Sequence, residues 1–414
     1  NTRGIEIRGM IDRKIGFYTF FTDNQSILPS YVQDQVALNP VVPHEGFWKA
    51  FKTNGVDFFQ ARGYIDFSVS RHVNMQFGHD RTFIGNGYRS LIFSDYAPPH
   101  LFLRANAKVW RINYLFQLNR VISNTSGSSG GSSGSGSRYP EKYIGFHHAS
   151  INIGKKLNLG FFESVIFSPR DSVNSNSFEL SYLNPVIFYR AIEQQAGSSD
   201  NAILGMDFKW LVAKGISLYG QFVLDEFLLR EIKARNGWWA NKYALQGGIK
   251  YINVAGVNNL DVQIETNVVR PYTYSHHTPG NFSSYRQSMA HPLGANFYEF
   301  VGIIRYQPIP RLNLIAKGFV SKKGVDGTGE NWGGNILSNN STRQNDYGNE
   351  IGQGIENKIS FVDITASYQV KHNVFVDVKQ IMRMSKSPSA LYNTNTSVTS
   401  VALRWNIPQR LYDF

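Results

Sequence analysis

The chain has no cysteine among its 414 residues. Disulfide bridges, thiol nucleophiles and cysteine-ligated metals are therefore excluded. No stretch comes near the ~18 consecutive apolar residues that a transmembrane helix needs. Charged residues make up 17 % of the chain, below the roughly one quarter that is usual for soluble domains. Neither an initiator methionine nor a signal peptide stands at Asn1, so we expect a processed or trimmed chain.

Aromatic residues, by contrast, make up 14 % of the chain, with 22 Tyr and 29 Phe. The net charge is +12, which favours an anionic partner such as nucleic acid, anionic lipid or an acidic glycan. The basic residues are spread along the chain, and no run of Lys and Arg is longer than three residues. This dispersion disfavours nucleic acid, since nucleic-acid binding normally requires a concentrated basic patch.

The dominant pattern is alternation with a period of two residues. In residues 359–370, Val362 and Ile364 fall on one face and Asp363 and Thr365 on the other. The same alternation occurs in 240–252, 258–270 and 373–384. Side chains of a strand point alternately to its two faces, so these segments are predicted strands with one apolar and one charged face.

This pattern predicts about 17 strands, each close to ten residues long. They cover 4–10, 15–22, 56–69, 71–79, 100–109, 111–122, 143–154, 157–167, 202–213, 216–226, 240–253, 258–270, 295–307, 311–322, 359–370, 373–384 and 397–407.

The connections between these strands are alternately short and long. Short links lie near 11–14, 70, 110, 155, 214, 254–257, 308–310 and 371–372. Long links cover 23–55, 80–99, 123–142, 168–201, 227–239, 271–294, 323–358 and 385–396. Short periplasmic turns, long extracellular loops and amphipathic strands are typical of a transmembrane outer-membrane β-barrel. We therefore expect an all-β, single-domain barrel over residues 1–414, in a bacterial outer membrane.

Aromatic residues near strand ends support the barrel. Trp110, Trp210, Tyr219, Tyr298, Tyr306 and Trp405 stand where interfacial girdles are expected. The chain also ends in Phe414, with Tyr412 two residues earlier. A terminal aromatic residue on the last strand resembles the insertion signal of bacterial barrels.

An odd strand count conflicts with the usual barrel, which has an even number and starts in the periplasm. We therefore expect one strand to precede Asn1, giving about 18 strands; the alternative is a barrel of 16 strands.

A tract of twelve Ser and Gly, residues 126–137, lies in one of the long loops. It is flexible coil, and it resembles an engineered replacement for a removed loop more than a natural mobile loop.

Enzymatic chemistry finds little support in the sequence. In "GFHHASIN" (145–152), His147 and His148 point to opposite faces of a strand, so they cannot act together. Ser150 shares a face with His148, but no accompanying catalytic motif is present. The loop "GHDRTFIGNGYRS" (78–90) lacks the strand-to-helix context of a phosphate-binding turn. It is better interpreted as a loop folded into the barrel mouth by arginine hydrogen bonds. We expect no enzyme and no cofactor.

Two further loops contain possible cation ligands. Asp326 and Glu330 in "DGTGEN" lack the full spacing of an EF-hand. His276 and His277 fit an ordinary polar loop better than a metal site. No metal is expected.

The remaining candidates are aromatic residues of the loops and polar residues of the barrel interior. Aromatic rings stack on sugars and also anchor protein interfaces, so the loop residues are candidates for binding a glycan or a partner protein. They are Trp238, Trp239, Tyr272, Tyr274, Tyr285, Trp332 and Tyr347. The candidates for the interior or mouth are His79, Asp80, Arg81, Arg89, Arg190, Asp261, Glu265, Glu299, Arg305, Asp363, Asp377, Lys379 and Arg383.

Several stretches resemble a known family. "FGHDRTFIGNGYRSLIFSDYAPPHLFLR" (77–104) and "FELSYLNPVIFYRAIEQQAGSSDNAILGMDFKW" (178–210) resemble the Wzi-type capsule-assembly barrels. Residues 1–25 and 218–227 are similar to the gliding-motility RemB branch of that family in Bacteroidota. The resemblance implies an 18-stranded, non-enzymatic barrel that holds capsular polysaccharide or serves surface motility and adhesion. The family's sugar-contacting residues do not map by motif onto this chain.

Two functions follow as hypotheses. The first is a barrel whose loops engage surface polysaccharide or motility, secretion or adhesion partners, with outer-membrane lipid and lipopolysaccharide around it. The second is a porin-like channel for small polar or anionic solutes, lined by the inward charges. Loops 23–55, 168–201 and 323–358 are long enough to plug such a barrel. An open pore keeps its charges solvated, whereas a plugged one pairs them.

Overall fold

The computed structural model describes residues 1–39, 41–123, 140–168, 182, 184, 200–277, 280–405 and 411–414. The Ser/Gly tract 126–137, most of loop 168–201 and Arg190 lie outside the described residues. Within the described ranges, no helix has the length and apolarity needed to cross a bilayer.

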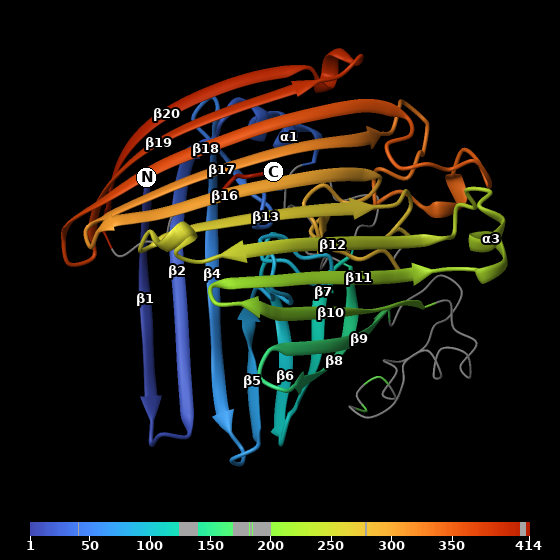
Figure 1. The fold of residues 1–414 in the computed structure, drawn as a ribbon. Coiled ribbons are helices and arrows are strands. Elements are labelled where there is room, and N and C mark those ends of the chain that lie inside the picture. The colour runs from blue at the N-terminus through green and yellow to red at the C-terminus, as the bar shows by residue number, and fades with distance from the viewer. Residues whose placement is uncertain are drawn as a thin grey trace.

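The chain forms one 18-stranded sheet in which the long strands pair antiparallel in chain order (Figure 1). Its strands are β1 (Thr2–Ile11), β2 (Ile15–Ile27), β3 (Lys49–Phe51), β4 (Gly55–Ser68), β5 (Val73–Asp80), β6 (His100–Val109), β7 (Ile112–Ile122), β8 (Glu141–Ile153), β9 (Leu157–Phe167), β10 (Asn201–Ala213), β11 (Ile216–Glu226), β12 (Lys242–Tyr251), β13 (Leu260–Val269), β16 (Phe297–Ile309), β17 (Leu312–Val325), β18 (Ile355–Lys371), β19 (Val374–Lys386) and β20 (Thr394–Trp405).

The remaining elements are short. They are the helices α1 (Ser30–Leu38) and α3 (Leu229–Ala234), the 3-10 turns η2 (Val254–Gly256), η3 (Asn340–Thr342) and η4 (Ala390–Tyr392), and the hairpin β14 (Ser283–Ser284) with β15 (Gln287–Ser288). Each predicted strand is confirmed, and the additional member of the sheet is the three-residue β3, which pairs with β4.

The sheet curls strongly but does not close on itself. Among the described residues, β1 pairs only with β2 and β20 only with β19, so the sheet is open between β1 and β20. In Figure 1, β1, β2 and β4 run down the page while β10 to β20 run across it, and the sheet wraps around a concave interior. The strand predicted to precede Asn1 stays a prediction.

Alternation gives the sheet an apolar outer face and a polar inner face. On β18, Ile364 is 49 % exposed whereas its neighbour Asp363 is 2 % exposed. The short turns lie at one end of the strands and the long loops at the other. Left-handed backbone closes the turns, as at Asp12 (φ 48°) and Arg13 (φ 54°) between β1 and β2.

The long loops fold back into the concave interior and fill it. Tyr31 and Val32 of α1 are buried beside inward residues of β16 to β19. Leu91 and Phe93 of loop 81–99 are fully buried in a second cluster with residues of β8 to β13. Of the loop predicted over residues 78–90, residues 78–80 instead belong to β5, whereas Arg89 and Ser90 are buried in the interior. The described residues of the segment 270–296, among them Tyr274, Phe282 and Met289, complete this filling.

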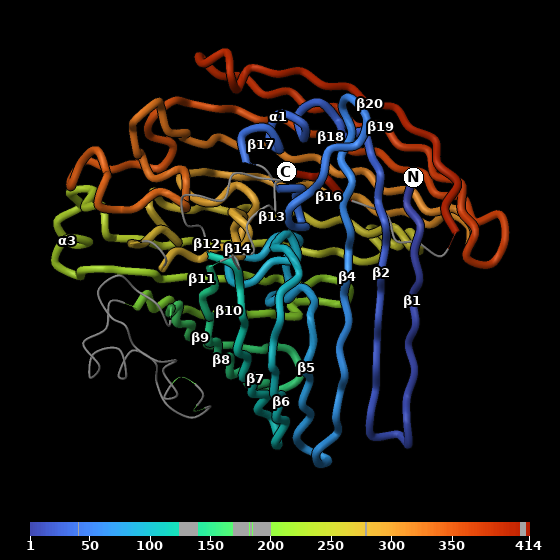
Figure 2. Tube along the Cα trace, turned by 180° about the vertical axis from the view of Figure 1, so that it is seen from behind, coloured from blue at the N-terminus to red at the C-terminus, as the bar shows by residue number. Residues whose placement is uncertain are grey.

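Two aromatic predictions are wrong. Tyr219 is 2 % exposed and faces the interior, so it belongs to no girdle. Phe414 does not end the last strand, because β20 stops at Trp405. Residues 411–414 instead lie on the concave side, where Figure 2 also places the chain end. The Tyr31 hydroxyl donates to the Tyr412 carbonyl oxygen (2.6 Å), and the ring of Phe414 packs edge-on against Tyr31.

Candidate functional site at the loop end

Inward carboxylates of β13 and β16 hold loop 81–99 in place. The Glu265 carboxylate accepts the backbone N–H groups of Tyr88 (2.6 Å) and Arg89 (3.0 Å) and the hydroxyl of Tyr219 (2.8 Å). A carboxylate that accepts backbone N–H groups makes strong, charge-assisted hydrogen bonds. Glu265 therefore fixes both the position and the direction of the loop inside the sheet.

Glu299 completes the same network. Its carboxylate lies 3.3 Å from the Arg89 guanidinium and 2.7 Å from Nε2 of His291. The Asn267 amide donates to both Glu265 and Glu299, at 3.0 Å each. Burial lowers the pKa of His291, although the neighbouring Glu299 opposes the shift. Two loops, 81–99 and 270–296, and three strands, β11, β13 and β16, meet at these side chains.

A second network spans β17 to β19. Lys317 lies 3.2 Å from Asp413 and 3.7 Å from Asp363, and Lys379 lies 3.0 Å from Asp363. Lys317 thus explains the inward position of the chain end, because the carboxylate of Asp413 needs a buried cation.

The other predicted interior residues are mostly paired as well. The pairs are Asp377 with Arg404 (2.7 Å), Arg81 with Glu45 (2.6 Å), Asp80 with Arg62 (3.7 Å), Arg305 with Gln263 (3.3 Å), Asp261 with the Asn253 N–H (3.1 Å), and Arg383 over the Tyr31 ring (4.8 Å). His79 is a correction to the predicted interior set, although its Nδ1 also has a partner, the Ala61 carbonyl oxygen at 3.1 Å. It is exposed on the outer face of β5 with Phe77, because alternate residues of a strand point to opposite faces.

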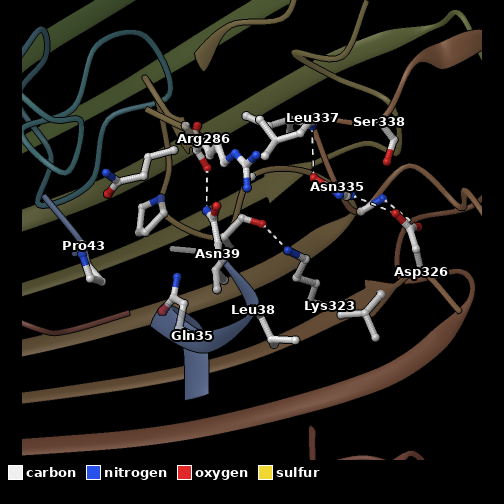
Figure 3. Close-up of a pocket in the computed structure, with 18 of the residues that line it drawn as sticks. Gln35, Leu38, Asn39, Pro43, Arg286, Lys323, Asp326, Asn335, Leu337 and Ser338 are labelled. Atoms are coloured by element: carbon white, nitrogen blue, oxygen red, sulfur yellow. Dashed lines mark hydrogen bonds between the residues drawn. The ribbon is translucent and has the colours of Figure 1, made fainter. Parts of the chain in front are cut away.

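Above this filled interior, at the loop end, lies a cavity of about 690 Å³. We call it the mouth cavity. Figure 3 shows α1, the segment 286–294, the end of β17 and the loop 326–338 around it. Tyr96 of loop 81–99 and Tyr392 of η4 complete its walls. The cavity therefore exists only because five long loops meet.

The mouth cavity has a polar, charge-balanced lining. Its charged side chains are Arg286, Lys323, Asp326 and Glu330, and its amides are Gln35, Asn39, Gln287 and Asn335. Some of these groups also hold the walls together. The Asn39 amide donates to the Arg286 carbonyl oxygen (2.8 Å), and Lys323 donates to the Leu293 carbonyl oxygen (2.7 Å). Such a lining suits a neutral or weakly charged ligand rich in hydroxyl groups.

The predicted aromatic candidates do not converge on this cavity. Tyr272 and Tyr274 are buried, and their hydroxyls donate to the carbonyl oxygens of Asn331 (2.9 Å) and Leu91 (2.6 Å). Tyr347, in contrast, is 53 % exposed. Burial with satisfied hydroxyls gives Tyr272 and Tyr274 a packing role in this structure.

The other aromatic candidates are partly buried. Trp239 lies between Trp238 and Tyr272, with the Arg343 guanidinium 4.2 Å from its ring centroid. The indole of Trp332 donates to Glu330 (2.7 Å), and Tyr285 packs edge-on against Phe47. Sequence reasoning missed Tyr392, Tyr96 and the cavity amides, because nothing local in the sequence marks loops that meet in space.

The possible catalytic and cation-binding residues have ordinary partners. His148 is paired with Asp207 (2.6 Å) on the inner face, while His147 packs beside Phe116. The carboxylate of Asp326 accepts the backbone N–H groups of Trp332 (2.7 Å) and Asn335 (3.2 Å). The described residues contain no cluster of three His, Asp or Glu side chains that could hold a metal ion.

Comparison with known proteins supports the fold. No protein-family model and no curated protein sequence matches this chain. Among solved structures, it resembles Wzi of Escherichia coli, an outer-membrane protein involved in group 1 capsule assembly and described as a carbohydrate-binding β-barrel. The TM-score is 0.61 at 13 % identity, over 99 % of this chain and 79 % of Wzi.

More remote matches include OccK7 of Pseudomonas aeruginosa, with a TM-score of 0.45 at 10 % identity over 98 % of this chain and 91 % of that one. OccAB2 of Acinetobacter baumannii gives 0.47 at 8 % identity, over 97 % and 90 %. At these identities the likeness concerns the fold alone. The fold is that of an outer-membrane β-barrel, and an outer face of exposed Ile, Val, Phe and Met side chains belongs in the lipid of that membrane.

Proposed function

We propose that this protein is a non-enzymatic outer-membrane barrel that holds surface polysaccharide in the mouth cavity. The observation that carries the proposal is a polar cavity of about 690 Å³, open at the loop end, above an interior whose charges are paired. A groove of this kind takes a chain-like ligand from outside the cell. The filled interior supplies a rigid floor beneath it.

The chemistry of the lining favours a carbohydrate. Amide side chains such as Gln35 and Asn335 donate and accept hydrogen bonds together, as sugar hydroxyls require. Tyr392 at the wall offers a ring on which the apolar face of a sugar can stack. The balance of Arg286 and Lys323 against Asp326 and Glu330 favours a neutral or weakly acidic glycan inside the cavity. The net charge of +12 would attract acidic glycans towards the surface.

A finer proposal rests on the sequence resemblance to the gliding-motility branch. In that version the loop end also engages a protein of the motility, secretion or adhesion machinery. The exposed ring of Tyr347, outside the mouth cavity, is a suitable contact for such a partner.

The alternative is a channel for small polar or anionic solutes. One feature favours it: a cavity of about 910 Å³ between β1 and β20, lined among others by Arg8, Arg62 and Arg404. The paired charges of the interior argue against a channel, because the charged side chains of an open pore would be solvated by water and not paired with each other. Single-channel recording in a planar bilayer separates the two functions, and steady conductance of porin size would establish the channel.

Binding of purified surface polysaccharide fragments to the detergent-solubilised protein tests the proposal. We expect Tyr392→Ala to weaken binding about fivefold, as removal of roughly 1 kcal/mol of ring contact predicts. Tyr347→Ala is the matched control, since this exposed ring lies outside the cavity, and it should leave the affinity unchanged. Loss of binding in Tyr347→Ala with normal binding in Tyr392→Ala would move the glycan site to the outer loops.

A further inference from the structure

Three lysines stand side by side on the outer face of the sheet, at the loop end. Lys322 of β17 is directly opposite Lys358 of β18, which is directly opposite Lys386 of β19. Cross-strand neighbours have Cβ atoms about 5 Å apart, and like charges in such positions repel each other. We call these three residues the lysine row. Its placement destabilises the sheet unless an anion compensates the charge.

One carboxylate of the chain compensates part of this charge. Glu356 lies 2.6 Å from Lys322 and 2.7 Å from Lys358. Within the described part of the chain, Lys386 forms no ion pair with a carboxylate. The row therefore keeps an excess of two positive charges, since three lysines face one glutamate. All of these side chains are substantially exposed.

Directly below the lysine row, the outer face becomes apolar. The next row across the strands contains Phe300, Val320, Ser360 and Met384, and its three apolar members are 52 %, 58 % and 40 % exposed. Together the two rows line a groove of about 470 Å³ whose edge also includes Tyr298. The groove thus offers cationic groups at its upper end and apolar side chains at its lower end.

The height of the lysine row matches the outer edge of the membrane. Lys358 is ten residues from Tyr368 along β18, where Tyr368 is exposed near the turn end. At about 3.3 Å per residue and a tilt of about 40°, this separation is about 25 Å along the barrel axis, the usual height of the apolar band. The row therefore lies where the headgroups of the outer leaflet begin.

We infer that the lysine row and the apolar residues below it form a binding site for a phosphorylated, acylated glycolipid of the outer leaflet, the chemistry of the lipid A part of lipopolysaccharide. The lysines would contact the phosphates and the apolar row the first part of the acyl chains. The site is independent of the mouth cavity and of the proposed polysaccharide binding. It would fix the barrel at one height and orientation in the membrane.

The test uses the full chain in neutral detergent, titrated with bisphosphorylated lipid A and followed by native mass spectrometry and by thermal unfolding. The wild type should retain bound lipid A and be stabilised by it. Lys322→Gln/Lys358→Gln/Lys386→Gln should weaken binding by about tenfold to hundredfold, since each surface lysine contributes about one power of ten or less. Added salt should weaken the wild type more than the variant.

Matched controls make the outcome decisive. Lys14→Gln/Lys155→Gln/Lys156→Gln removes the same charge from exposed lysines of the short turns and should bind normally. Lys386→Gln alone, which breaks no ion pair with Glu356, should weaken binding and leave folding intact. Equal binding by wild type and the lysine-row variant, or equal loss in the turn-lysine variant, would overturn the inference. So would inorganic phosphate that stabilises the wild type as well as lipid A does.

Discussion

The Arg89 guanidinium lies 3.3 Å from the Glu299 carboxylate, although 210 residues separate them in sequence. Arg89 comes from a long loop and Glu299 from the loop end of β16. Both side chains are buried, so each depends on the other for its charge to be tolerated. This ion pair therefore anchors loop 81–99, which fills part of the interior, to β16 of the sheet.

Breaking that pair should be costly. Glu299→Gln leaves the buried guanidinium without its counter-charge and should lower the free energy of unfolding by about 3 kcal/mol or more. Asp346→Asn breaks the more exposed Arg343–Asp346 pair (2.5 Å) and should cost at most about 1 kcal/mol. Urea unfolding of both variants in detergent measures the difference. Equal losses in the free energy of unfolding would show that the Arg89–Glu299 pair does not anchor the loop.

Gly85 in loop 81–99 should not tolerate a side chain. Its φ is 132°, and a Cβ atom would lie 2.2 Å from Nε2 of Gln221. That amide donates to the Ile84 carbonyl oxygen, and its oxygen accepts the Leu91 N–H. Gly85→Ala should therefore destabilise the protein by about 1–3 kcal/mol. Gly318→Ala, where the added Cβ meets nothing within 4 Å, is the control and should be nearly neutral.

Strand positions followed from the sequence because alternation is a local property. The inward side of Asp363 and Asp377 was predictable from their neighbours alone, and the short turns then set the register. His79 was misplaced because the loop interpretation of residues 78–90 overrode the apolar face that it shares with Phe77. The same alternation, applied within the predicted strand 71–79, assigns His79 to the outer face.

The loops were less predictable, because their positions depend on contacts between distant segments. The apolar run Leu91–Phe93 was the available signal that loop 81–99 is buried. Nothing local distinguishes the buried ring of Tyr274 from the exposed ring of Tyr347. The hydroxyl of Tyr274 finds its acceptor, the Leu91 carbonyl oxygen, 183 residues away, and that contact decides its burial. The mouth cavity likewise forms where segments that are distant in the sequence contact each other.

Acidification should destabilise the protein through His276. Burial lowers the pKa of this loop histidine from 6.5 to about 4, and the nearby Lys242 acts in the same direction. Between these values the unfolded chain binds a proton that the folded protein does not, so unfolding is favoured as pH falls. The loss approaches 1.4 kcal/mol per pH unit for one such group, and full stability returns above about pH 6.5.

Thermal unfolding of wild type and His276→Gln between pH 4 and pH 7 measures this effect. The variant lacks the titrating group, so its melting temperature should fall less steeply over that interval. His72→Gln, at an exposed turn, is the control and should follow the wild type. Parallel curves for His276→Gln and wild type would contradict a neutral, buried His276.

The retention of loop 81–99 inside the sheet can be tested by conductance. Glu265 accepts two backbone N–H groups of this loop, and Gln221 accepts another from Leu91 at 2.7 Å. Glu265→Ala/Gln221→Ala removes these three hydrogen bonds and a fourth, which the Gln221 amide donates to the Ile84 carbonyl oxygen. The Gln246 amide still donates to the Arg89 carbonyl oxygen at 2.9 Å. The loop should then leave the interior transiently rather than permanently.

Planar-bilayer recording should therefore show silence for the wild type and brief, irregular openings for Glu265→Ala/Gln221→Ala. Glu330→Ala, which removes a carboxylate from the mouth cavity but no hydrogen bond to loop 81–99, should stay silent. Steady wild-type conductance would instead mean that solutes pass beside the loop, through the region between β1 and β20. Openings confined to the double variant mean that hydrogen bonds to Glu265 and Gln221 keep the barrel shut, because those bonds are the interactions the variant lacks.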